Sequence, residues 1–230
     1  MRKLVLVVST LALASLAACG GGDAGLITAN WSFQTVAGGA IPTCPPTFTT
    51  AAVHAQSVTG GGGDIIDLYN CDDFTGTSDY PIDDYDVFIA ITTDGGGTLY
   101  GETLTGAVDL TTGDKTYTAQ LLDDGGYFEF DWQLQGEATN ANLDCSQVNP
   151  DSIEILSTLN TDSTLKTDKF DCEDQTGITA GLVAGDYMVA VQALNASDAA
   201  IGTSADKAGT IRDHNGLTDL GLFTIAITGM

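Results

Sequence analysis

Short runs of alternating apolar and polar residues recur along the chain, and this two-residue period is that of a β-strand with one buried face. The clearest runs lie at residues 31–34, 86–91, 132–135, 152–156, 187–191 and 222–227. Clusters of glycine, asparagine and aspartate between them predict turns. We expect helix only as a short turn near residues 204–208. Many short strands with frequent turns predict an all-β protein built from β-sandwiches of about 100 residues each.

The second half of the chain repeats landmarks of the first half at an offset of 101 residues. The landmark pairs are Trp31 with Trp132, Cys44 with Cys145, and Cys71 with Cys172. The sequence around the later cysteines also agrees, since residues 69–76 match residues 170–177. These coincidences predict an internal duplication, with one β-sandwich over residues 26–129 and a second over residues 130–230.

The passage between the two repeats is expected to be tight. Residues 127–132 end the first repeat and begin the second without a flexible linker, so a strand should pass almost directly between the domains. The first repeat also carries extra residues between Gly101 and Gly126, which predict a longer hairpin.

The first residues have the layout of a secretory signal, with two basic residues followed by an apolar run. Leu16-Ala17-Ala18-Cys19 closes this run and resembles the bacterial lipobox. The resemblance implies that residues 1–18 are removed as a lipoprotein signal peptide, that Cys19 is lipidated, and that residues 19–25 form a glycine-rich tether. It also implies an exported protein anchored in the cell envelope, and Gly20 favours the outer membrane.

Four cysteines remain when Cys19 is set aside, and in an exported chain they indicate two disulfides with three possible pairings. The duplication chooses among them, because a repeat that was once a single unit would have paired its own cysteines. The predicted disulfides are Cys44–Cys71 and Cys145–Cys172. A zinc site is the alternative, but the chain has no close C-x-x-C pair. Both tryptophans lie inside alternating runs, which predicts core positions packed on the disulfides.

Residues 177–191 resemble the bacterial prealbumin-like or carboxypeptidase-regulatory-like sandwiches, in which a glycine turn feeds a tyrosine-bearing strand. The match rests on Gly185-Asp186-Tyr187 and the apolar alternation after it. The first repeat departs from this pattern, because Ile82-Asp83-Asp84-Tyr85 stands where the glycine should be. The resemblance implies two tandem Ig-like or prealbumin-like β-sandwiches that act as non-catalytic accessory modules.

The formal net charge of −24 reflects 31 acidic residues and only seven basic ones. This balance excludes nucleic-acid binding, which needs lysine and arginine to neutralise phosphates. It also repels anionic lipid headgroups, so the Cys19 lipid alone would hold the protein at the membrane. An acidic surface attracts cations or a basic partner, and the candidate partners are an envelope protein or a polysaccharide.

One set of acidic residues recurs in both repeats and is the best candidate for cation binding. Its members lie near the second cysteine of each repeat or precede a tyrosine-bearing strand, and they are Asp67, Asp72, Asp73, Asp84, Asp168, Glu173, Asp174 and Asp186. Calcium takes about six to eight oxygen ligands, so loops clamped by a disulfide could bring such carboxylates together around Ca²⁺. The alternative is that they are solvated turn residues, since turns favour aspartate and the sequence has no D-x-D-x-D-G loop.

We expect no enzymatic activity, because the sequence lacks G-x-S-x-G, H-E-x-x-H and P-loop patterns. His54 corresponds to Ile155 at the repeat offset, which indicates a tolerated substitution, and His214 lies in an Asn-Gly turn that should face solvent. The predicted function is a non-enzymatic binding or spacer module with an acidic surface. The alternative is a calcium-dependent adhesion or glycan-binding module, and a hydrolase with its site in the longer hairpin ranks third.

Overall fold

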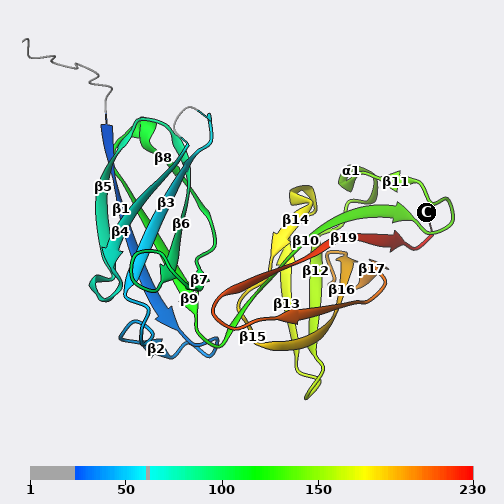
Figure 1. Ribbon diagram of the computed structural model, residues 1–230. Coiled ribbons are helices and arrows are strands. Elements are labelled where there is room, and N and C mark those ends of the chain that lie inside the picture. Colours follow the sequence, from blue (N-terminus) through cyan, green and yellow to red (C-terminus); the bar gives the residue numbers. More distant parts are fainter. Residues whose placement is uncertain (1–23, 61–62, 230) are drawn as a thin grey trace, which may run out of the picture.

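The computed structural model describes residues 24–60 and 63–229. These residues form two β-sandwiches that follow each other along the chain (Figure 1). Each sandwich contains one disulfide. The predicted all-β class and its sandwich architecture are therefore confirmed.

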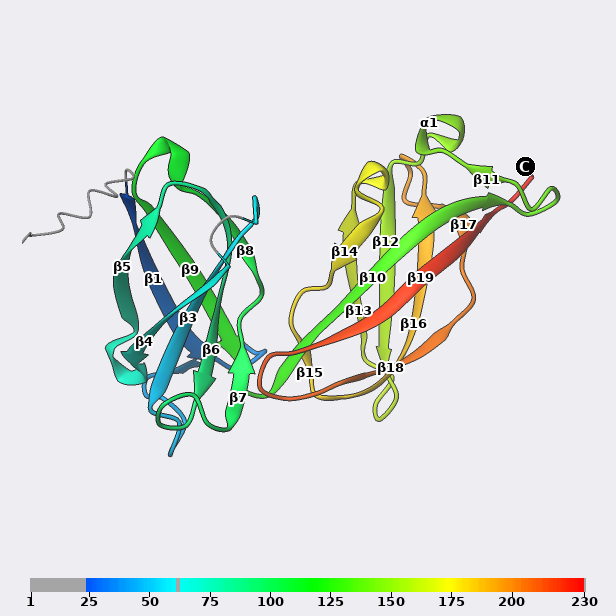
Figure 2. The ribbon, with the colours of Figure 1, turned by 45° about the horizontal axis from the view of Figure 1, so that its top comes forward.

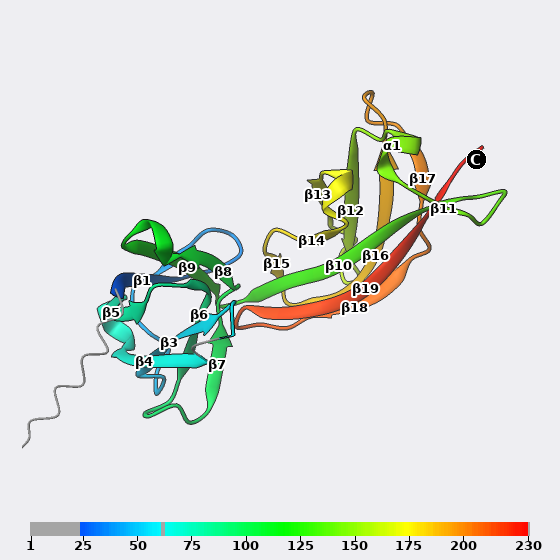
Figure 3. The same cartoon turned by 90° about the horizontal axis from the view of Figure 1, so that it is seen from above.

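The first sandwich packs a four-stranded sheet against a five-stranded sheet, and Figure 3 shows the two layers from above. The four-stranded sheet contains β1 (Ala24–Gln34), β2 (Ala40–Ile41), β5 (Thr75–Pro81) and β9 (Lys115–Leu122). The five-stranded sheet contains β3 (Thr50–Ser57), β4 (Asp64–Asn70), β6 (Asp84–Thr92), β7 (Leu99–Glu102) and β8 (Gly106–Asp109). Two 3₁₀ turns connect the layers, η1 (Cys71–Asp73) and η2 (Leu110–Thr112).

The second sandwich follows the same order of strands. Its strands are β10 (Gly125–Gly136), β11 (Asn142–Leu143), β12 (Ser152–Leu159), β13 (Leu165–Phe170), β14 (Thr176–Ile178), β15 (Leu182–Val183), β16 (Gly185–Leu194), β17 (Ala200–Thr203), β18 (Lys207–Ile211) and β19 (Gly216–Ile227). It also contains the helix α1 (Cys145–Val148) and the 3₁₀ turn η3 (Cys172–Asp174). Because β17 pairs with both β16 and β19, the two layers join at one edge into a ten-stranded sheet.

In each sandwich the first strand runs parallel to the last one. β1 and β9 pair without a break from Ile27 with Lys115 to Gln34 with Leu122. β10 and β19 pair in the same direction, and Figure 2 shows them side by side along the second sandwich. A strand thus enters each domain at one end and the chain leaves it at the other.

In the first strand of each sandwich, every second side chain is buried in the core. In β10, Phe128, Phe130, Trp132 and Leu134 are buried between the layers, and the residues between them are more exposed. Trp31 and Trp132 are each 3% exposed, which confirms their predicted core positions. The period-two pattern therefore identified the buried face of these strands.

Strand pairing places the boundary between the two domains a few residues earlier in the chain than the sequence predicted. Residues 125–129, expected in the first repeat, begin β10 and pair with β14, β15 and β19 of the second sandwich. The covalent linker between β9 and β10 consists of Asp123 and Asp124. The longer hairpin expected over residues 101–126 is instead β8, η2 and β9, because β9 is the strand that extends the first sheet beside β1.

The prediction of a helical turn near residues 204–208 is wrong, because that stretch leads into β18. The helix is α1, and it begins after Asp144 in a capping box, where the Gln147 side chain accepts a hydrogen bond of 2.7 Å from the Asp144 backbone nitrogen. The proposed signal peptide and Cys19 lie outside the described residues. Over residues 24–60 and 63–229, no helix has the length and apolarity needed to cross a membrane.

Candidate binding surface

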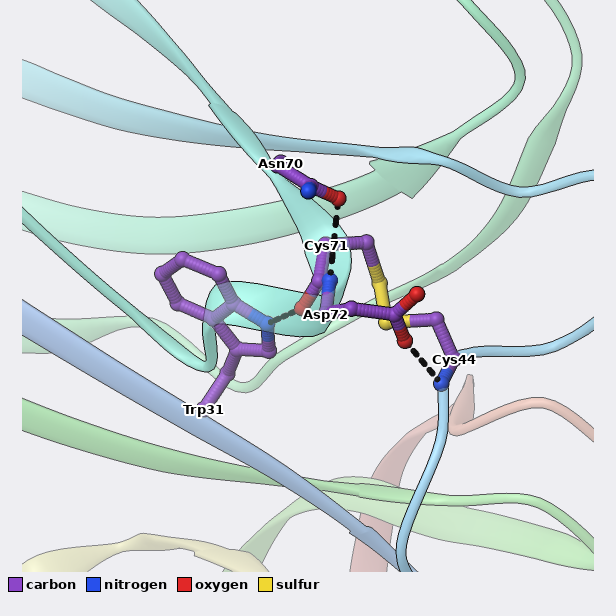
Figure 4. Close-up of a disulfide and its surroundings, with 5 residues drawn as sticks. All are labelled: Trp31, Cys44, Asn70, Cys71 and Asp72. Carbon is purple, nitrogen blue, oxygen red and sulfur yellow. Dashed lines mark hydrogen bonds between the residues drawn. A yellow bond between two sulfur atoms is a disulfide. The ribbon is translucent and has the colours of Figure 1, made fainter.

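A disulfide fastens one corner of each sandwich, and Figure 4 shows the one in the first domain. The pairs are the predicted ones, Cys44–Cys71 and Cys145–Cys172. The indole Nε1 of Trp31 donates a hydrogen bond of 2.8 Å to the Cys71 carbonyl oxygen (Figure 4). Trp132 donates the equivalent bond to the Cys172 carbonyl oxygen at 3.2 Å. The two corners therefore share one construction, in which the core tryptophan holds the disulfide-bonded turn.

The acidic residues at the first disulfide differ in what they contact. Asp72 Oδ1 accepts a hydrogen bond of 2.9 Å from the Cys44 backbone nitrogen, and the Asn70 side chain accepts one of 3.2 Å from the Asp72 backbone nitrogen (Figure 4). Asp73 is exposed. Asp72 thus ties the cysteine loop to η1, a structural role that the sequence pattern did not indicate.

Two more candidate metal ligands are engaged by hydroxyl groups. Asp67 Oδ2 accepts a hydrogen bond of 2.7 Å from the Tyr80 hydroxyl. Asp186 Oδ1 accepts one of 2.6 Å from the Thr210 hydroxyl. Burial raises the pKa of Asp168 above its usual value. Asp67 lies on β4 of the first domain, and Asp168 and Asp186 lie on different strands of the second, so the three carboxylates do not form one site.

The remaining candidates do not converge either. Asp84 pairs across the strands with Asp109, and loss of water followed by the charge of Asp109 raises the pKa of Asp84. Glu173 and Asp174 are exposed at η3. Within the described residues, no three histidine, cysteine, aspartate or glutamate side chains gather in a way that could hold a metal ion. Calcium binding stays a prediction, which a thermal melt with calcium and then with chelator would test.

The outer face of the β4–β3–β6 sheet is largely apolar over two adjacent rows of residues, in which His54 is the one polar side chain and Ala52 and Ala90 are buried. Strand pairing forms one row from Ile66, His54 and Phe88 and the next from Leu68, Ala52 and Ala90. We call these six residues the apolar face. Ile66 is 50% exposed and Leu68 is 55% exposed. The rings of His54 and Phe88 stack with their centroids 4.4 Å apart, so the face continues across three strands.

The second domain carries more polar residues in the same two rows. Strand pairing there forms the rows Thr167, Leu156, Ala190 and Lys169, Glu154, Gln192. Gln192 Nε2 donates a hydrogen bond of 2.6 Å to Glu154, and Lys169 pairs with Asp198 at 2.6 Å. The second row of this face is therefore polar in the second domain and apolar in the first.

The strand register also corrects the comparison of His54. Its counterpart is Leu156 rather than Ile155, because the second domain has one more residue between its first cysteine and this strand. Ile155 is buried and corresponds to the buried Val53. His54 lies on the outer face, where its Nδ1 is 3.1 Å from Asp64 Oδ2.

Asn215 joins the two domains. It is 4% exposed and has a φ of 63° in the turn before β19, a left-handed conformation that asparagine adopts more readily than most residues. Its side-chain oxygen accepts a hydrogen bond of 2.8 Å from the Leu122 backbone nitrogen, and its side-chain nitrogen donates one of 2.6 Å to the Glu102 carbonyl. Both partners belong to the first domain, so one buried amide clamps the domains together.

His214 also lies at this junction, and its side chain is 40% exposed, so the predicted solvent-facing position is correct in part. Its ring packs on Tyr100 with the centroids 4.2 Å apart. The Tyr100 hydroxyl donates a hydrogen bond to Asp123, and burial followed by this bond raises the pKa of Tyr100. A Cβ atom on Gly101 would collide with the His214 carbonyl oxygen, so the two backbones are in close contact. Together with Phe48, these rings line a cavity of about 570 Å³.

Sequence reasoning missed both Asn215 and the apolar face. The face had a usable signal, because Ile66 aligns with Thr167 and Leu68 with Lys169 at the repeat offset. Asn215 had none beyond its place in a turn, since its side-chain partners are 93 and 113 residues away in the chain.

No protein-family model and no curated protein matches the chain. Solved structures show a weak likeness over most of its length. The minor pilin GBS52 of Streptococcus agalactiae is 10% identical with a TM-score of 0.30, and the alignment covers 90% of this chain and 98% of the pilin. A candidate adhesin from Bacteroides ovatus is 13% identical with a TM-score of 0.33, covering 90% of this chain and 89% of the adhesin.

A third structure, a candidate polysaccharide-binding protein from Bacteroides thetaiotaomicron, is 9% identical with a TM-score of 0.32. Its alignment covers 77% of this chain and 78% of that protein. TM-scores this low do not establish a common fold.

Proposed function

We propose that this protein is a non-enzymatic arm of the cell envelope, exported and anchored through a lipid on Cys19, that presents an acidic binding surface. We further propose that its two domains arose by internal duplication. The common strand order, the equally spaced disulfides and the paired tryptophan hydrogen bonds support this origin.

The observation that carries the proposal is the Asn215 clamp at the junction. β1 begins at Ala24, so Ala24 and Gly25, predicted as the end of the tether, belong to this strand instead. The second domain is attached at the opposite end of the first (Figure 1). The 11 residues of β1 span roughly 35 Å, and the 12 residues of β10 span roughly 40 Å beyond the junction. A clamped junction turns these two lengths into an arm of fixed geometry.

Asn215→Ala is expected to loosen this arm. The change leaves the Leu122 nitrogen and the Glu102 carbonyl without their partner at a buried site, at a cost of about 1–3 kcal/mol for each unsatisfied group. Small-angle X-ray scattering should show a broader distribution of interatomic distances, and proteolysis should be faster at Asp123-Asp124. Asn195→Ala is the matched control, because Asn195 bonds only within a loop of the second domain. Identical scattering from wild type and Asn215→Ala would contradict a clamped arm.

Cys19→Ala is expected to move the protein from the membrane fraction to the soluble fraction of the cell envelope. The acidic surface adds no attraction to anionic headgroups, so loss of the lipid should remove nearly all membrane affinity. Fractionation followed by immunoblotting measures this, with Asn195→Ala as a control that keeps Cys19 and both disulfides. An unchanged membrane fraction would refute the anchor.

A further inference from the structure

Two positions on the edge strand of the first domain carry exposed apolar residues where the second domain has polar ones, although the second domain exposes Leu165 and Met188 in a neighbouring row. Ile66 and Leu68 are half exposed on β4, whereas Thr167 and Lys169 hold the same positions on β13. The two domains share strand order and register here, so the sheet does not need apolar side chains at these positions in order to fold. Ile66 and Leu68 are neighbours on one face of β4, and adjacent exposed apolar residues that the core does not require favour contact with another molecule.

β4 also offers a free edge for backbone hydrogen bonds. Among the described strands it pairs only with β3, over all of Asp64–Asn70. β13 is an edge strand as well, but it carries Lys166 and Lys169, and lysine on an edge strand opposes the addition of another strand. β4 contains neither lysine nor proline. An extended segment can therefore add to β4 through main-chain hydrogen bonds.

The acidic charge around β4 favours an added segment that carries basic side chains. Lys115 is the only lysine or arginine of the first domain. The Asp67 carboxylate lies on the opposite side of β4 from Ile66 and Leu68, at the Tyr80 hydroxyl. Side chains of an added strand alternate between these two sides. Apolar side chains would then meet Ile66 and Leu68, and basic side chains would meet Asp67.

We propose that β4 docks an extended segment of another envelope protein in which apolar and basic residues alternate. The acidic charge disfavours a second copy of this chain, because pairing two such domains would bring like charges together. The inference deepens the proposed binding function, since it names the binding strand and the chemistry of its partner.

The test is the binding of a defined peptide to the purified full chain. The peptide alternates valine and lysine over about seven residues, the length of β4, and carries a fluorescent label for anisotropy. The double variant Ile66→Thr/Leu68→Lys gives β4 the residues of β13 and should weaken binding about tenfold or more, because it removes two apolar contacts and places on the edge strand a lysine that repels the basic peptide. The reference variant is Thr167→Ser/Lys169→Arg, which should bind like wild type.

Three further measurements make the test specific. A peptide alternating valine and glutamate should not bind, and a peptide N-methylated on alternate residues along the edge that pairs should lose about tenfold or more in affinity if main-chain hydrogen bonds hold it. The double variant should melt like wild type, because both changed side chains are exposed. Equal binding by wild type and double variant, or no binding at all, would overturn the inference.

Sedimentation of the full chain tests whether a second copy of the protein, instead of another protein, pairs with β4. A dimer that the double variant abolishes would overturn the inference in favour of self-association. None of these readouts depends on the Cys19 lipid or on the Asn215 clamp, so the docking strand can fail while the arm stands, and the reverse also holds.

Discussion

Replacing Cys44 and Cys71 together with serine is expected to lower the free energy of unfolding of the first domain by about 3 kcal/mol. The disulfide joins residues 27 positions apart and encloses β3 and β4, so its loss frees a long loop in the unfolded chain. In a domain of about 100 residues each kcal/mol shifts the melting temperature by about 4–8 °C, which predicts a fall of roughly 12–24 °C. Differential scanning calorimetry of the oxidised protein measures it.

The matched control is the double serine variant of Cys145 and Cys172. It removes a disulfide of the same sequence separation from the second domain and should shift the transition of that domain by a similar amount. Both cysteines are replaced in each variant because a single replacement would leave a reactive free thiol. A first-domain transition that stays within a few degrees of wild type would contradict the stabilising role of the Cys44–Cys71 bond.

Trp132→Ala is expected to cost the second domain about 3–5 kcal/mol, because it empties a large buried site. The Trp132 ring is 3% exposed, and its centroid lies 5.6 Å from that of Phe130 and 5.9 Å from that of Phe170. The change also removes the donor to the Cys172 carbonyl. Urea unfolding followed by circular dichroism measures the loss, while the fluorescence of Trp31, then the only tryptophan, reports the first domain separately.

Trp132→Phe separates packing from hydrogen bonding. Phenylalanine fills most of the ring volume but leaves the Cys172 carbonyl unpaired, so the expected cost is smaller, at about 1–3 kcal/mol. If phenylalanine and alanine lowered stability equally, ring packing would not be the main contribution of this side chain.

The features that could be predicted are those that follow from the local alternation of apolar and polar residues or from the internal duplication. Trp31 and Trp132 lie in alternating runs, and the two-residue period placed them in the core. The disulfide pairing followed from the duplication alone, because Cys44–Cys71 and Cys145–Cys172 have the same separation.

The features that could not be predicted depend on which strands pair. The local sequence of residues 125–129 fits either domain, and their pairing with β14, β15 and β19 assigns them to the second. A one-residue difference beside α1 misaligned His54 with Ile155. Asn215 contacts strands about a hundred residues earlier, so no local pattern marks it.

The parallel pairing of first and last strands has a mechanical consequence. In the first domain the chain enters at Ala24 and leaves at Leu122, at opposite ends of the paired strands β1 and β9. Tension along the chain would load the hydrogen bonds between these strands in shear, all of them together, instead of peeling them apart one at a time. β10 and β19 repeat this geometry in the second domain, so each domain resists being pulled open from its ends.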